Sequence, residues 1–128
     1  MKKFSFNLDT VLKVRKHKET EAIKELLESQ KEYDKVMQLL RDLEEETRLL
    51  ELELQHKQAQ CENVHNFSDY IVYIQMLKGK RLKQEDEVLK HRNFVDNKRN
   101  MVMLAQQDKK VIETLEEKQF ADWKKEME

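Results

Sequence analysis

Three residues near the middle of the chain, His56, Cys61 and His65, are the first candidates for chemistry, because histidine and cysteine are common zinc ligands. If this stretch is helical, His56 and His65 are nine residues apart. That spacing is a rotation of about 900°, so the two imidazoles lie on opposite faces and cannot share one metal ion. We therefore predict no metal site, and we interpret Cys61 as a small apolar residue of a helix interface.

Two charged clusters offer other kinds of chemistry. Residues 44–46 are three successive glutamates, but paired catalytic carboxylates need a cleft, and a solvated helix face is the better interpretation. Four cations between residues 13 and 18 could contact nucleic acid, or they could match an acidic C-terminal segment. With one Gly and one Cys, a phosphate-binding loop and a Cys-x-x-Cys motif are both excluded. The sequence thus predicts a protein that is not an enzyme and has no cofactor.

The composition indicates long helices. The chain has 128 residues, of which 40% are charged, with a single Gly and no Pro. Sandwiches, barrels and repeated βαβ units need frequent tight turns, so they are disfavoured. A net charge of −1 argues against bulk electrostatic binding to nucleic acid or anionic membranes. A lone Cys and apolar runs of no more than five residues predict a soluble cytoplasmic protein without a transmembrane segment.

Apolar residues recur with alternating spacings of three and four in both halves of the chain, which is the pattern of a coiled-coil seam. The first seam comprises Leu12, Arg15, Glu19, Ala22, Leu26, Ser29, Tyr33, Val36, Leu40, Leu43, Thr47, Leu50, Leu54, Lys57, Cys61 and Val64. The second comprises Tyr70, Ile74, Leu77, Arg81, Gln84, Val88, His91, Val95, Lys98, Val102, Ala105, Lys109, Ile112, Glu116, Gln119 and Trp123. Each seam predicts one long helix.

The break between the two seams is expected where turn-forming residues cluster. Residues 65–69 are the only such cluster, and Asn66 or Ser68 could cap the second helix while Asp69 favours its positive end. We therefore expect helix 1 over about residues 8–64, the turn over about 65–69 and helix 2 over about 69–125. Gly79 is expected to stay helical, at a cost of about 1 kcal/mol relative to Ala.

Charge decides between an antiparallel hairpin and a parallel dimer. Residues 19–62 have a net charge of −7, and folding back sets them against residues 72–115, with +4. Like charges would face each other in a parallel dimer. We predict an all-α protein in which residues 1–128 form one domain, a single antiparallel coiled-coil hairpin of two long helices. With the expected turn, Leu12 would face Trp123 and Glu19 would oppose Glu116.

The segment Tyr70-Ile71-Val72-Tyr73-Ile74-Gln75-Met76-Leu77 is more apolar than a coiled coil requires. The seam uses three of these residues, and Ile71, Val72, Tyr73 and Met76 are left without cover on a two-helix structure. A surplus apolar patch of this kind is typical of a contact surface, although shielding by the turn or a short strand would also explain it.

Read together, these features resemble the FliJ family, small coiled-coil proteins of the bacterial flagellar export apparatus. The opening Phe4-x-Phe6-x-Leu8, followed by Val11, Leu12 and Arg15, is similar to the opening of the family's sequences. Ala22 and the Leu-rich first helix continue the resemblance. The stretch Lys109-Lys110-Val111-Ile112-Glu113-Thr114-Leu115-Glu116-Glu117-Lys118 resembles the family's C-terminal region. The resemblance covers nearly the whole chain.

The resemblance implies a hairpin similar to the rotor stalk of rotary ATP synthases. It would sit in the hole of the hexameric export ATPase FliI, contact the membrane export gate FlhA and escort export chaperones, and ATP chemistry would belong to the partner. The implied location is the cytoplasm, with peripheral association at the cytoplasmic face of the membrane. The positions that match the family's gate contact, with the neighbouring Met76, are Tyr73, Met76, Leu77, Lys80 and Gln84.

The expected ATPase-ring contact lies at the end of the hairpin that carries both termini. Phe4, Phe6 and Leu8 precede the regular seam, so they form either a hydrophobic plug over Trp123 or a tip that enters the ring. Two alternatives to the export function remain open at this point. One is a generic coiled-coil scaffold or holdase chaperone, and the other is a stalk subunit of an injectisome or a rotary ATPase.

Overall fold

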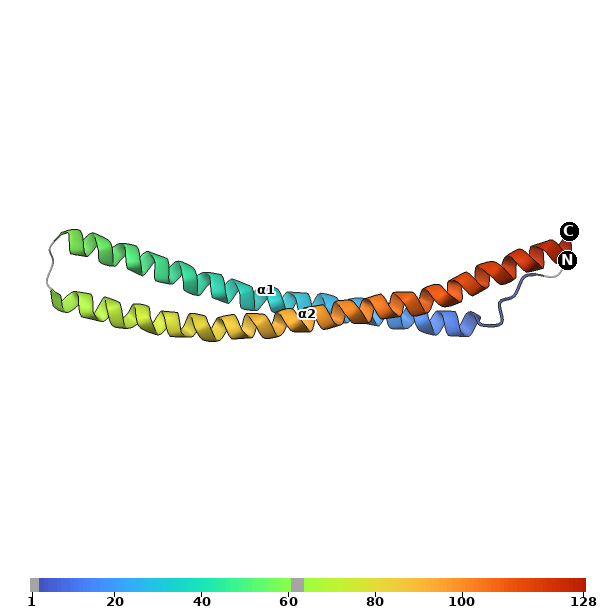
Figure 1. The fold of residues 1–128 in the computed structure, drawn as a ribbon, viewed down its shortest axis with the longest axis horizontal. Coiled ribbons are helices and arrows are strands. Elements are labelled where there is room, and N and C mark those ends of the chain that lie inside the picture. Colours follow the sequence, from blue (N-terminus) through green and yellow to red (C-terminus); the bar gives the residue numbers. More distant parts are fainter. Residues whose placement is uncertain (1–2, 61–63) are drawn as a thin grey trace. The chain divides into compact units, whose positions relative to one another are not determined.

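The chain folds into two long helices, α1 (Asp9–Ala59) and α2 (Val64–Met127) (Figure 1). The computed structural model describes the backbone of residues 3–60 and 64–128 and the side chains of 3–60 and 67–128. These ranges contain no strand. The expected all-α class is therefore confirmed. Gly79 lies inside α2 as predicted, and a Cβ atom added there would have no neighbouring atom within 4 Å.

Residues of the two helices cluster into two compact units, each containing a segment of α1 and a segment of α2. The terminal unit comprises residues 1–29 and 95–128, and the middle unit comprises residues 30–94. In the terminal unit, Glu19 pairs with Lys109 and Glu25 with Lys98. Rising numbers on α1 are matched by falling numbers on α2, so the helices pack antiparallel there.

The middle unit has the same antiparallel arrangement. Glu46 accepts a hydrogen bond from Tyr73, while Glu53, further along α1, accepts one from Tyr70, which comes earlier in α2. Glu51 pairs with Lys78. This ion pair and the two of the terminal unit each join a glutamate of α1 to a lysine of α2, which is the complementarity that the segment charges predicted.

The two predicted seams are confirmed. Every seam position among the residues with described side chains is buried or partly buried. The polar seam residue Thr47 is 5% exposed, and its hydroxyl donates to the carbonyl oxygen of Leu43 (2.8 Å), so burial leaves that hydroxyl satisfied. Cys61 and Val64, the last two positions of the first seam, lie outside the residues whose side chains are described.

The register between the seams differs from the expected one. Leu12 is buried in a cluster with Phe6 and Ile112, not opposite Trp123. Glu19 does not oppose Glu116 but pairs with Lys109, with 2.9 Å between Oε2 and Nζ. This hydrogen-bonded pairing raises the pKa of the Lys109 ammonium. The partner of Leu12 thus lies about three helical turns earlier on α2 than we expected.

The shifted register follows from the position of the turn. Residues 65–69, expected to form the turn, belong to α2, and α1 ends at Ala59 instead of near residue 64. Contacts with α1 favour helix here, since the Tyr70 hydroxyl donates to Glu53 (2.9 Å) and the Lys57 ammonium lies 4.9 Å from the Tyr70 ring centre. Ser68 and Asp69 have helical backbone and solvent-exposed side chains, so their turn propensity is overridden. The side chain of Asn66, the other expected cap, lies outside the described side chains.

A pair of introduced cysteines distinguishes the two registers. With Cys61→Ser as background, Leu12→Cys with Ile112→Cys is expected to form an intramolecular disulfide, because the two side chains share one buried cluster. Leu12→Cys with Trp123→Cys, the pair of the other register, is the matched control and should not crosslink within one chain. Non-reducing electrophoresis under mild oxidation reads the result, and efficient crosslinking of the 12–123 pair alone would contradict the observed register.

Candidate partner-binding surfaces

The first candidate surface lies on the part of α2 that belongs to the middle unit. Tyr73, Met76 and Lys80 are all exposed, as predicted. The Tyr73 hydroxyl donates to Oε1 of Glu46 on α1 (2.8 Å), and this hydrogen bond to a carboxylate raises the pKa of Tyr73. This hydrogen bond restrains the orientation of the ring, and the residue as a whole is 40% exposed.

Two residues expected on this surface are interior instead. Leu77 is 1% exposed, and Gln84 is partly buried, with its amide donating to the carbonyl oxygen of Val36 on α1 (2.8 Å). Leu77 and Gln84 are covered because both are seam positions and therefore face α1. Tyr73 and Lys80 lie at the edge of the seam and stay exposed. The face that a partner can reach therefore consists of Tyr73, Met76 and Lys80, which we call the α2 face.

The surplus of apolar side chains around this face is confirmed. Ile71 and Val72 are exposed together with Tyr73 and Met76. On α1 of the same unit, Leu49 and Leu52 are exposed as well, and the sequence reasoning did not single them out. It also missed Glu46, which orients Tyr73. The acidic run 44–46 was the available signal, because Glu46 is one of its three glutamates.

The second candidate surface is an aromatic cluster in the terminal unit, formed by Phe4, Phe120 and Trp123. The Phe4 ring lies edge-on to Phe120, with 5.2 Å between centroids, and is tilted toward Trp123 at 5.8 Å. Phe120 stacks on Trp123 at 5.9 Å. Such aromatic pairs each contribute roughly 0.5–1.5 kcal/mol beyond the area that they bury. Phe120 was not predicted, because it lies off the seam.

The rest of the N-terminal segment packs beside the aromatic cluster. Phe6 is 9% exposed in the cluster with Leu12 and Ile112, and Leu8 is partly buried against the same cluster. Because Leu12 packs against Ile112, roughly the last three turns of α2 extend beyond the start of α1 (Figure 1). Residues 3–8 are not helical, and the contacts of Phe4 with Phe120 and Trp123 place this segment along these turns.

The four residues expected to contact the ATPase ring are thus brought together in the terminal unit. Phe6 and Leu8 close the helix pair, while in the aromatic cluster Phe120 is exposed and Phe4 and Trp123 are partly buried. This arrangement matches the plug that we considered from the sequence. The contact with the ring remains a proposal.

The candidates for chemistry have ordinary structural partners. In the basic stretch 13–18, Lys13 pairs with Asp9 (3.3 Å) and Arg15 donates to the backbone carbonyl oxygen of Asp108 (2.6 Å). In the run 44–46, hydrogen bonds from Arg48 lower the pKa of Glu45. No group of three His, Cys, Asp or Glu residues within the described ranges could hold a metal ion. The side chains of Cys61 and His65 lie outside those ranges.

Comparison with known proteins returned a family. A family model described as FliJ, flagellar FliJ protein, matches residues 4–128, which is nearly the whole chain. No curated protein and no solved structure matches the chain. In the part of the chain that the structure describes, neither helix has a stretch apolar enough to cross a membrane.

Proposed function

The chain belongs to the flagellar FliJ protein family, and from this premise we propose that it is a non-enzymatic stalk that joins the export ATPase to the export gate. Membership makes the chain a component of the flagellar protein export apparatus. The partners are the finer part of the proposal. They are the hexameric ATPase FliI, the membrane export gate FlhA and export chaperones.

The observation that carries the proposal is the antiparallel pairing of two long helices, with separate apolar surfaces in two different units. A pair of helices offers no enclosed cleft for catalysis, but it is suited to insertion into a ring. The aromatic cluster of Phe4, Phe120 and Trp123 supplies a surface for the ATPase. The α2 face, Tyr73 with Met76 and Lys80, supplies a surface for the gate.

We propose that the protein acts in the cytoplasm and reaches the membrane only through the gate. The formal charge of −1 gives little attraction to anionic lipid, which supports attachment through a protein partner. Escort of empty chaperones completes the proposed role. The match to a flagellar family favours this role over a stalk of an injectisome or a generic scaffold.

Removal of residues 1–8 tests the ATPase contact. The truncated protein is expected to lose most of its stimulation of ATP hydrolysis by purified FliI while it keeps most of its helicity, because residues 3–8 contribute no helical turn. Circular dichroism measures the helicity, and phosphate release measures the stimulation. Leu82→Ala, which changes one exposed residue of the middle unit, is the control and should stimulate normally. Proportional loss of helicity and stimulation would mean that the segment is only a structural plug.

A further inference from the structure

One flank of the terminal unit carries apolar side chains that neither seam uses. On α2, Met101, Leu104 and Val111 are 50%, 60% and 63% exposed. Their spacings of three and seven residues put them on one face of the helix. Positions that border the seam of a two-helix coiled coil are often Glu or Lys, so apolar residues there indicate a further layer of packing.

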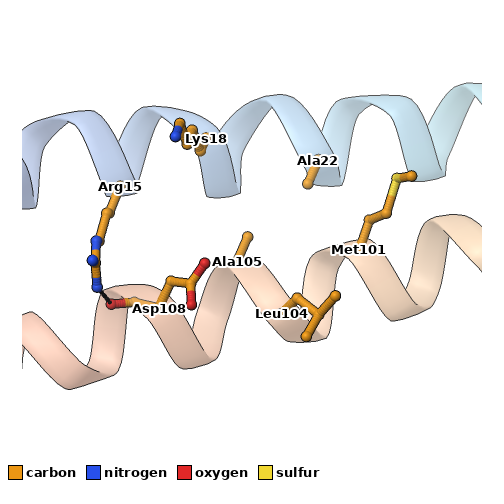
Figure 2. A pocket seen from close by; sticks show the side chains of 7 residues that line it. All are labelled: Arg15, Lys18, Ala22, Met101, Leu104, Ala105 and Asp108. Atoms are coloured by element: carbon orange, nitrogen blue, oxygen red, sulfur yellow. Dashed lines mark hydrogen bonds between the residues drawn. The ribbon is translucent and has the colours of Figure 1, made fainter.

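The seam beside this face is hollow. Ala22 and Ala105 point toward each other across the space between the helices (Figure 2), and their small side chains leave a cavity of about 340 Å³. Met101 and Leu104 line it on the α2 side. The hollow is open to the flank, so an apolar side chain from outside the unit could enter it.

The rim of the hollow carries two cations of α1 and one carboxylate of α2, and the Arg15 guanidinium already donates to the backbone carbonyl oxygen of Asp108 (2.6 Å). Lys18 lies on the α1 side and Asp108 on the α2 side, and both line the hollow. Neither side chain forms an ion pair with any residue of the described ranges. On α1, Val14 lies one turn before Lys18 and is also exposed. On α1, Val14 thus lies beside the unpaired ammonium of Lys18, and on α2 the apolar residues lie beside the unpaired carboxylate of Asp108.

We propose that this flank, made of Val14, Lys18, Met101, Leu104, Asp108 and Val111, is an interface between two copies of the chain. A two-fold axis parallel to the helices places α1 of one copy over α2 of the other. Lys18 of each copy then faces Asp108 of its mate, and Val14 faces the region of Val111. The flank is self-complementary in charge and in polarity, so no other occupant is needed to cover it.

The pairing is weak and depends on concentration, because the apolar area is small and only two ion pairs form. The chain is therefore a monomer when dilute and a dimer when concentrated. The flank and the aromatic cluster belong to the same unit but share no residue. This inference concerns the free protein and stands or falls separately from the proposed ATPase contact.

Sedimentation equilibrium of the full chain over a wide concentration range tests the interface. Leu104→Glu is expected to raise the dimer dissociation constant at least tenfold, because it puts a charge on the apolar centre of the flank. Met103→Glu is the matched control. Met103 is equally exposed but is rotated about 100° from Leu104, so its replacement should leave the dissociation constant unchanged.

A charge exchange makes the test specific. Lys18→Asp and Asp108→Lys should each weaken the dimer severalfold, and the double variant should restore it. Circular dichroism of each variant establishes that the helices are intact. A wild-type chain that stays monomeric at the highest concentration would overturn the proposal. So would equal effects of Leu104→Glu and Met103→Glu, or a double variant as weak as the single ones.

Discussion

Tyr73→Ala is expected to weaken binding to the export gate at least tenfold, with the melting temperature nearly unchanged and ATPase stimulation intact. Tyr73 is 40% exposed at the edge of the helix interface, and its hydroxyl is hydrogen-bonded to Glu46 of α1. An aromatic anchor at a protein contact typically contributes about 2 kcal/mol or more. Binding of the purified variant to the cytoplasmic part of FlhA, measured by calorimetry, checks the expectation.

Two further variants separate the contact from its support. Val72→Ala removes an exposed apolar side chain next to Tyr73 and should bind the gate normally, since Val72 lies on another face of α2. Tyr73→Phe keeps the ring and removes only the hydrogen bond to Glu46, so a small loss of affinity is expected. A large drop in melting temperature for Tyr73→Ala with gate binding intact would show that Tyr73 is structural.

Leu77→Ala is expected to lower stability and to leave gate binding intact, which is the reverse of Tyr73→Ala. Leu77 is the most completely buried large side chain described, and removal of such a residue from a core costs about 2–5 kcal/mol. Because a helix pair can relax around the gap, we expect the free energy of unfolding to fall by about 2–3 kcal/mol, measured as a shift of the urea midpoint. The folded variant should still bind the gate.

Leu82→Ala is the matched control for this loss of stability, because Leu82 is 59% exposed on the same helix and should change the urea midpoint little. The prediction fails if Leu77→Ala leaves stability unchanged and abolishes gate binding. That outcome would mean that Leu77 is available to the partner.

The seams were predictable from sequence because they depend on a repeated pattern. Spacings of three and four fix which side of a helix is apolar, so even charged members such as Glu19 and Lys109 were identified as interior positions. Their long side chains reach across the seam and pair with each other. The direction of packing was also predictable, since it depends on the net charge of whole segments and not on individual contacts.

The register was not predictable from the same pattern, because both seams repeat and can be matched at several offsets. Only the turn selects one offset, and residues 65–69 have turn propensity without forming a turn. Contacts of Tyr70 with Lys57 and Glu53 favour helix there. A sequence containing these residues does not reveal which of its local preferences will be overridden by tertiary contacts.

The candidate surfaces were partly predictable. Residues off the seam, such as Tyr73 and Met76, were correctly expected to be exposed. Leu77 and Gln84 satisfy the seam spacing and the expected contact spacing at once, and burial between the helices decides in favour of the seam. The link between Phe4 and Phe120 depends on how a non-helical segment crosses the end of α2, which periodicity does not describe.

The central claim is that this chain joins the ATPase to the gate during flagellar export. Flagellin secreted into the medium by a strain that lacks the chain tests this claim most directly. We expect secretion to fall to background, to return with the wild-type chain, and to stay low with Tyr73→Ala although that variant still stimulates the ATPase. Normal secretion in the absence of the chain would contradict the proposed function.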